Sequence, residues 1–187
     1  KSEVNDSCAD AESIREAMVG VLRQGINLLA SLDDEAYVRR VPQAFDSTIG
    51  GHYRHCLEHF EPLVEGLAAV VDHDARKRDP SVESDRGTAL RRTEELLSAC
   101  LDLPLESLEI PIRVRYKVSY DAAHDPLAGS TVAREGMFAV SHAIHHFALI
   151  KVMAESLEVS LPGGFGMAPS TAAFRAGTVQ ADSSKRL

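Results

Sequence analysis

Three histidines lie close together in the segment His142-Ala143-Ile144-His145-His146. His142 and His146 are four residues apart, so on a helix their side chains lie on the same face. This spacing allows two imidazoles to hold one metal ion. The segment therefore predicts two ligands of a metal site, with His145 at the margin of the same face.

A second histidine cluster lies far upstream, in another segment with helical character. His52 and His59 are seven residues apart and align on a helix, with His55 about 60° to one side. A mononuclear catalytic site needs three protein ligands and one open position. The two clusters can supply these ligands between them, and spacing alone leaves open which upstream histidine takes part.

The alternative is a polar core network without a metal, because a single buried histidine is more often a hydrogen-bonded core residue than a ligand. Burial of several imidazoles leaves many donors and acceptors to satisfy, which favours the metal site when two helices carry six histidines. His73 and His124 lie in polar segments, and we expect both to be solvated.

Two further side chains lie near the histidines in sequence or on the same helical face. Cys56 can act as a thiol nucleophile or as a small apolar packing residue, and the packing interpretation is favoured. Glu135 lies two turns before His142 on the same face, so it can accept a hydrogen bond from a ligand imidazole. It can equally pair with Arg134 or Arg54. No general base is predicted.

The composition is that of an ordinary folded protein. The chain has 187 residues, of which 44% are hydrophobic and 26% charged, so we expect a single domain over residues 1–187. The net charge of -8 and the lack of a basic stripe argue against nucleic-acid binding. The histidines interrupt the most apolar run, so no membrane span is expected. Three scattered cysteines fit a reducing, cytoplasmic setting.

Apolar residues recur at helical spacing in four segments, so the predicted fold is all-α. The predicted helices are about 10–32, 48–71, 81–103 and 131–157, with caps at Ser47 or Thr48, at Ser81 or Ser84, and at Ser130 or Thr131. Residues 33–47 are expected to be a loop, and 161–187 an irregular tail after a bundle of about 10–160. Gly50-Gly51 suits a close helix contact, access to the metal, or a frayed first turn.

Residues 108–120 show a different pattern from the rest of the chain. Apolar and polar residues alternate there, which is typical of a half-buried extended segment or hairpin. Pro111 lacks a backbone N–H, so it indicates an edge strand or an irregular one. We expect a long extended crossover before the last helix.

Two motifs carry a resemblance to a known family. Residues 48–55 read Thr-Ile-Gly-Gly-His-Tyr-Arg-His, and residues 141–146 read Ser-His-Ala-Ile-His-His. Together they resemble the DinB-like metalloprotein superfamily, which includes damage-inducible proteins and thiol-dependent transferases. The resemblance implies a four-helix bundle and the ligand set His55, His142 and His146. His52 and His59 then become neighbours of the site, with His52 the main competitor as a ligand.

The resemblance also implies a function. The expected protein is a divalent-metal-dependent enzyme using Zn, Ni or Fe, with a small-molecule substrate and no bound organic cofactor. Transfer of a low-molecular-weight thiol is the first expectation and hydrolysis the second. The alternative is a non-catalytic metal-binding stress or interaction protein. A homodimer formed through an exposed helix face is a further expectation. The segment 164–171 resembles a family-specific ending and is expected to pack near the site.

Overall fold

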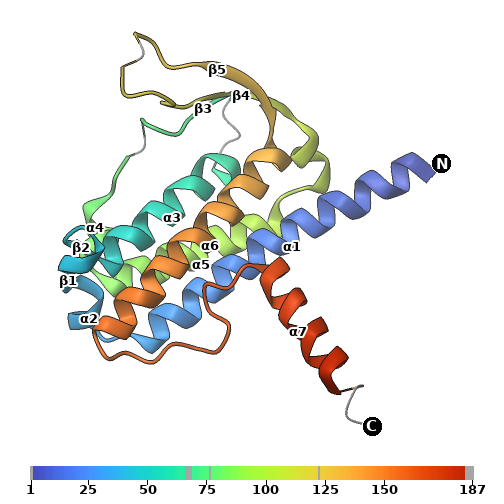
Figure 1. Ribbon diagram of the computed structural model, residues 1–187. Coiled ribbons are helices and arrows are strands. Elements are labelled where there is room, and N and C mark those ends of the chain that lie inside the picture. The colour runs from blue at the N-terminus through green and yellow to red at the C-terminus, as the bar shows by residue number, and fades with distance from the viewer. Residues whose placement is uncertain (1, 66–68, 76, 122, 184–187) are drawn as a thin grey trace.

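The computed structural model describes residues 2–65, 69–75, 77–121 and 123–183. The described part is mostly helical, and four of its helices are long and pack alongside one another (Figure 1). They are α1 (Ser2–Ser31), α3 (Ile49–Val64), α5 (Arg86–Asp102) and α6 (Val132–Ser156). The all-α class predicted from the periodicity is therefore broadly confirmed, with small sheets added.

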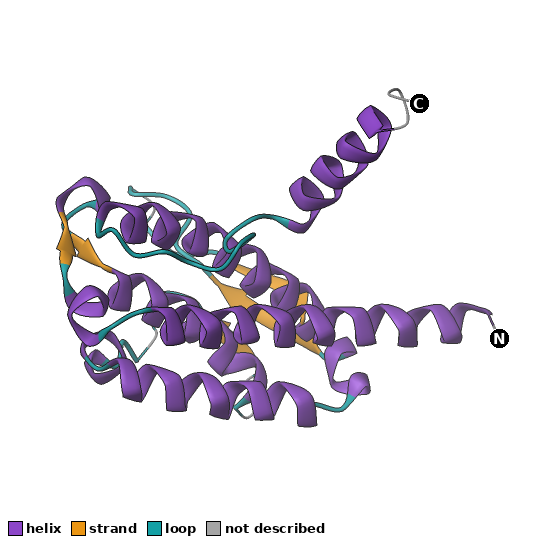
Figure 2. Cartoon of the chain, turned by 90° about the horizontal axis from the view of Figure 1, so that it is seen from below, coloured by secondary structure: helices purple, strands orange, loops and turns teal. Residues whose placement is uncertain are grey.

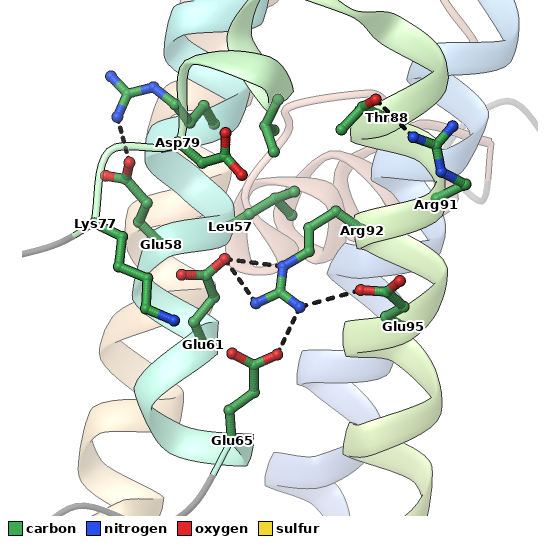
Figure 3. A pocket seen from close by; sticks show the side chains of 12 residues that line it. Leu57, Glu58, Glu61, Glu65, Lys77, Asp79, Thr88, Arg91, Arg92 and Glu95 are labelled. Atoms are coloured by element: carbon green, nitrogen blue, oxygen red, sulfur yellow. Dashed lines mark hydrogen bonds and ion pairs between the residues drawn. The ribbon is translucent and has the colours of Figure 1, made fainter.

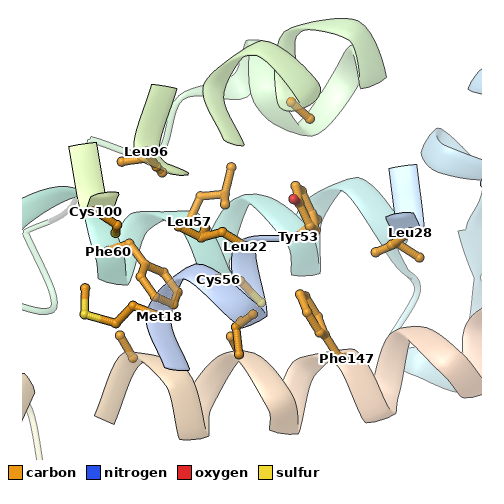
Figure 4. Close-up of a cluster of buried hydrophobic side chains, with 14 of the residues drawn as sticks. Met18, Leu22, Leu28, Tyr53, Cys56, Leu57, Phe60, Leu96, Cys100 and Phe147 are labelled. Carbon is orange, nitrogen blue, oxygen red and sulfur yellow. The ribbon is translucent and has the colours of Figure 1, made fainter. Parts of the chain in front are cut away.

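The core lies where the apolar stripes of these four helices meet (Figure 4). Met18 and Leu22 of α1 are buried beside Tyr53 and Phe60 of α3, with Phe147 of α6 closing the layer. Full burial of one such side chain contributes about 1.5–3 kcal/mol. The shared core fixes the faces that α3 and α6 turn toward each other.

Side-chain caps start the two helices that carry the histidines. Thr48 Oγ1 accepts from Gly51 N over 2.9 Å at the start of α3, and Thr131 Oγ1 accepts from Arg134 N over 3.1 Å at the start of α6. Both caps are among those predicted. The prediction for the third helix was wrong, because Asp85 caps α5. The short α4 (Pro80–Ser84) precedes it with its own cap.

The segment before α3 that was predicted to be a loop contains short helices and strands. Asp33 caps the short α2 (Asp34–Val38), accepting from Ala36 N over 2.7 Å. The elements that follow are β1 (Arg40–Val41), η1 (Pro42–Ala44) and β2 (Ser47–Thr48), with β1 and β2 antiparallel. The predicted end of the next helix also shifts, since α3 stops at Val64 and residues 70–72 form a strand instead.

The crossover before α6 is extended, as predicted, but its strand is not at an edge. β4 (Pro111–Arg115) lies between β3 (Val70–Asp72), which is parallel to it, and β5 (Leu127–Thr131), which is antiparallel. Pro111 is the first residue of β4, a position where the missing N–H is tolerated. The proline thus marks where the strand begins and does not place it at the edge. η2 (Leu105–Glu109) links α5 to this sheet.

The C-terminal tail also differs from the prediction. Residues 161–168 are irregular, but α7 (Pro169–Ser183) is helical and stands away from the other helices (Figures 1 and 2). Phe165 is buried and stacks on Phe147 of α6, with ring centroids 4.8 Å apart. Gly166 has φ +69°, and an added Cβ would lie 2.7 Å from the Phe147 carbonyl carbon. The tail therefore passes α6 so closely at Gly166 that only glycine fits there.

The structure also decides between the three interpretations of Gly50. A Cβ added there would lie 2.1 Å from the backbone oxygen of Glu83. Close approach of α3 to α4 therefore explains this glycine.

By length and composition alone, α6 could cross a membrane, since one window of it has a mean hydropathy of 1.3. The core helix of a folded domain passes the same test. In this structure α6 packs lengthwise against α1 and α3 (Figure 1).

Candidate metal centre

Three histidines from two helices meet at the seam between α3 and α6. One ring nitrogen from each of His55, His142 and His146 lies within 4.8 Å of the others. The Nε2 atoms of His55 and His142 are 2.9 Å apart. The structure thus brings together the three residues that the resemblance implied.

The donor set fits a divalent cation. With bonds of about 2.0–2.1 Å, two nitrogens on a tetrahedral ion lie roughly 3.3 Å apart. The Nε2 atoms of His55 and His142 are 2.9 Å apart, and all three ligand atoms lie within 4.8 Å of one another, so ring rotations can bring them to ligating distances. Imidazole nitrogen suits Zn, Ni, Fe and Cu alike, so the donor set alone does not select the metal.

The site lies beside the core and not inside it. The core face of α6 is formed by Ala139, Ala143 and Phe147, which are at most 2% exposed. His142 and His146 are only half-buried, since they point along the seam toward α3. This position leaves the cluster within reach of a small molecule.

His52 lies next to the cluster. Its Nδ1 atom is 2.9 Å from Nδ1 of His146, whereas its Nε2 atom is buried without a hydrogen-bond partner. Burial lowers the pKa of His52, and the nearby His145 lowers it further. His145 itself is exposed, and so is His124, as predicted for the latter.

His59 packs against two members of the cluster. Its ring is edge-on to His142 and to His55, with centroids 4.3 and 5.0 Å away. Its Nδ1 atom is 3.2 Å from Nδ1 of His73.

The prediction that His73 is solvated was wrong. His73 is only 3% exposed, and its Nε2 atom lies 2.9 Å from Glu135 Oε2. Pairing of β3 with β4 extends to this residue, since His73 N donates to Arg115 O over 3.1 Å. Alternation along a strand then places His73 on the buried side with Val71. The two-residue spacing between Val71 and His73 was the sequence signal for this burial. The surrounding residues are mostly charged, so the segment was interpreted as a polar connection.

Glu135 accepts a hydrogen bond from an imidazole, and the donor is His73. Its two oxygens contact His73 Nε2 and Ser130 Oγ, and the side chain is buried. Arg54, one of the two arginines predicted to pair with Glu135, instead pairs with Glu58 and Glu83.

Glu58 was not singled out from the sequence, although it lies one helical turn after the His55 position. It is 4% exposed, and its Oε2 atom is 3.9 Å from Nδ1 of His55. Arg54 forms an ion pair with it. The negative charge of Glu58 therefore favours a proton on Nδ1 of His55, while the opposite ring nitrogen faces His142.

Glu58 also lines a charged cavity of about 410 Å³ between α3 and α5 (Figure 3). Arg92 stands at its centre and bonds to Glu61, Glu65 and Glu95. The Arg92 guanidinium lowers the pKa of Glu65. Acidic and basic side chains both line this cavity, so its lining does not favour binding of an anion.

Cys56 lies on the core side of α3, away from solvent. It is 2% exposed, and burial raises the pKa of its thiol. Both properties favour the packing interpretation over the nucleophile.

Comparison with known proteins gives a limited result. No family model matches the chain, and no solved structure matches it. The chain is 28% identical over 158 residues to FK506-binding protein 5 of Rhizopus delemar. The match covers 83% of this chain but 36% of that protein, so the chain spans about a third of its relative.

Proposed function

We propose that this chain is a DinB-like metal-dependent enzyme whose cation is held by His55, His142 and His146. The observation that carries the proposal is the meeting of three imidazole nitrogens within 4.8 Å on a half-buried seam. Three protein ligands leave a position for a substrate or nucleophile, as in catalytic sites. The cation, Zn, Ni or Fe, would lower the pKa of a nucleophile and polarise an electrophile.

The neighbouring side chains have defined roles in this proposal. The Glu58 carboxylate, 3.9 Å from Nδ1 of His55, favours a proton on that nitrogen, and His52 contacts Nδ1 of His146, so each of these rings would present its Nε2 atom to the cation. Such partners fix the tautomer and the orientation of a ligand imidazole. The chain itself thus binds the cation and keeps its rings in place.

The reaction proposed first is transfer of a low-molecular-weight thiol to a small electrophile, and hydrolysis is proposed second. The motifs at 48–55 and 141–146, four long helices and an extended crossover support the DinB-like assignment. The setting proposed is cytoplasmic, consistent with unpaired Cys56 and Cys100. A homodimer without nucleic-acid or membrane partners remains part of the proposal.

The match to the fungal protein supports a modular use of this unit. The region of similarity covers 83% of this chain and lies within a longer protein that is named for binding FK506. We propose that the helical unit works as one module there. Nothing about FK506 is proposed for this chain.

A second candidate is a metal-binding protein without turnover. His52 carries a buried Nε2 atom without a partner and lies 2.9 Å from His146 through Nδ1. Rotation of this ring into the cluster would add a fourth ligand and close the coordination shell, which is typical of structural sites.

The test is metal analysis of tag-free protein, followed by an activity assay with a panel of thiols and an electrophile. We expect about one divalent ion per chain in the wild type and its loss in His55→Ala and His142→Ala. His124→Ala is the matched control at an exposed histidine. Turnover that survives His142→Ala would refute the enzyme proposal, and bound metal without turnover would favour the second candidate.

A further inference from the structure

A chain of hydrogen bonds runs from Ser130, near the end of β5, to the metal centre. Ser130 Oγ donates to Glu135 Oε1 over 2.7 Å, and Glu135 Oε2 lies 2.9 Å from His73 Nε2. His73 Nδ1 lies 3.2 Å from His59 Nδ1. Glu135, His73 and His59 are 6%, 3% and 1% exposed, so bulk water does not compete for these bonds.

The carboxylate at one end sets the direction of the bonds that follow. A carboxylate only accepts, so His73 donates to Glu135 from Nε2. When His73 is neutral with its proton on Nε2, its Nδ1 atom carries a lone pair, and His59 donates to it. His59 is thereby held in the tautomer that has Nδ1 protonated and Nε2 unprotonated.

His59 is the point where this chain of bonds reaches the ligands. Its ring is edge-on to both His142 and His55, at centroid distances of 4.3 and 5.0 Å. A ring held in one orientation limits the orientations open to the two rings packed on it. Those two rings must aim their Nε2 atoms at one ion, so a fixed His59 favours the ligating arrangement.

We propose that Glu135 and His73 are positioning residues of the metal centre. They hold His59 in one tautomer and, through it, hold the His55 and His142 rings for ligation. This inference rests on the proposed function, because it requires that the histidines bind a cation. The proposal adds two residues to the metal centre. His73 directly follows β3, and Glu135 lies in the first turn of α6.

Two substitutions at one position separate positioning from simple packing. His73→Leu removes both ring nitrogens and keeps an apolar side chain in the buried site. His73→Gln keeps one acceptor and one donor, which can replace the bonds to His59 and Glu135. We expect His73→Leu to weaken zinc binding about 10–100-fold, and His73→Gln to stay close to the wild type. His124→Leu, at an exposed histidine, is the control.

Zinc affinity is measured by competition with a chromophoric chelator, and the tautomer by long-range ¹H–¹⁵N NMR of the metal-free protein. In the wild type and His73→Gln, His59 should show a protonated Nδ1 and an unprotonated Nε2. In His73→Leu it should redistribute between both tautomers. If His73 acted only through packing, glutamine would not be expected to restore the wild-type tautomer of His59.

An unchanged His59 tautomer in His73→Leu overturns the proposal. An altered tautomer with unchanged zinc affinity also overturns it, because the chain of bonds would then not position the ligands. A wild-type protein that binds no zinc refutes the proposed function and the positioning role together. That result is recognised from the wild-type titration alone, before any variant is compared.

Discussion

The Nδ1 atom of His52 lies 2.9 Å from the Nδ1 atom of His146, and this contact joins α3 to α6 at the edge of the histidine cluster. One of the two nitrogens must donate and the other accept. If His146 ligates through Nε2, its Nδ1 carries the proton and His52 accepts it. His52 then acts as the outer partner of a ligand.

Replacement of His52 by leucine should therefore weaken metal binding while sparing the fold. The lost contact to His146 is expected to cost about 10–100-fold in metal affinity. The free energy of unfolding of the metal-free protein should change little, because the substitution also removes the unsatisfied Nε2 atom. Zinc titration and denaturant unfolding measure the two effects. Loss of metal from His52→Leu together with tight binding by His146→Ala would reverse the assigned roles.

Glu58→Gln should lower metal affinity through His55. The carboxylate lies 3.9 Å from Nδ1 of His55, and its charge favours the ligand state of that ring. We expect metal affinity to fall by several-fold up to about tenfold. This lies at or below the lower end of the range of about 10–100-fold for outer partners of a ligand, because of the long distance. Glu94→Gln, on the exposed side of α5, is the control and should bind as the wild type does. Equal affinities for both variants would exclude a role for Glu58.

Gly50→Ala should destabilise the protein. The added Cβ would meet the Glu83 backbone oxygen at 2.1 Å, so α4 or α3 must move at a cost of about 1–3 kcal/mol. Gly20→Ala is the matched control within α1, since nothing lies within 4 Å of its added Cβ. That variant should gain about 0.5–1 kcal/mol. Urea unfolding of both variants tests the close contact directly.

Stability should depend on pH through Glu65. Arg92 lowers the pKa of this carboxyl below its ordinary value of 4.5. A group with a depressed folded-state pKa stabilises the protein above its unfolded pKa, and this contribution is lost as the pH falls through the folded value. Unfolding of Glu65→Gln should thus show a smaller loss of stability below about pH 4.5. The effect is small because the side chain is 38% exposed. A slope identical to that of the wild type would contradict it.

Metal removal should lower the thermal midpoint. A ligand at 100 times its Kd stabilises the folded state by about 2.7 kcal/mol, which corresponds to roughly 5–10 °C for a domain of this size. Chelation of the wild type should produce this decrease, and added zinc should reverse it. His55→Ala should show no response to either treatment. A chelator effect of equal size in that variant would mean that the ion binds elsewhere.

Part of the fold follows from local sequence signals. The periodicity of the long helices, the caps at Thr48 and Thr131, and the extended crossover were predicted because each depends on residues near one another in the chain. Helix α7 and the short elements between α1 and α3 were missed, since their periodic patterns are weak and their neighbours are polar.

The shared face of His142 and His146 is likewise a local property, set by the 3.6-residue period of a single helix. That much the sequence determined by itself. Which upstream histidine reaches this pair depends on how α3 is rotated against α6, and the common core sets that rotation. The burial of His73 beside Glu135 depends on the pairing of β3 with β4. Both relations join residues far apart in the chain, so only the tertiary structure decided them.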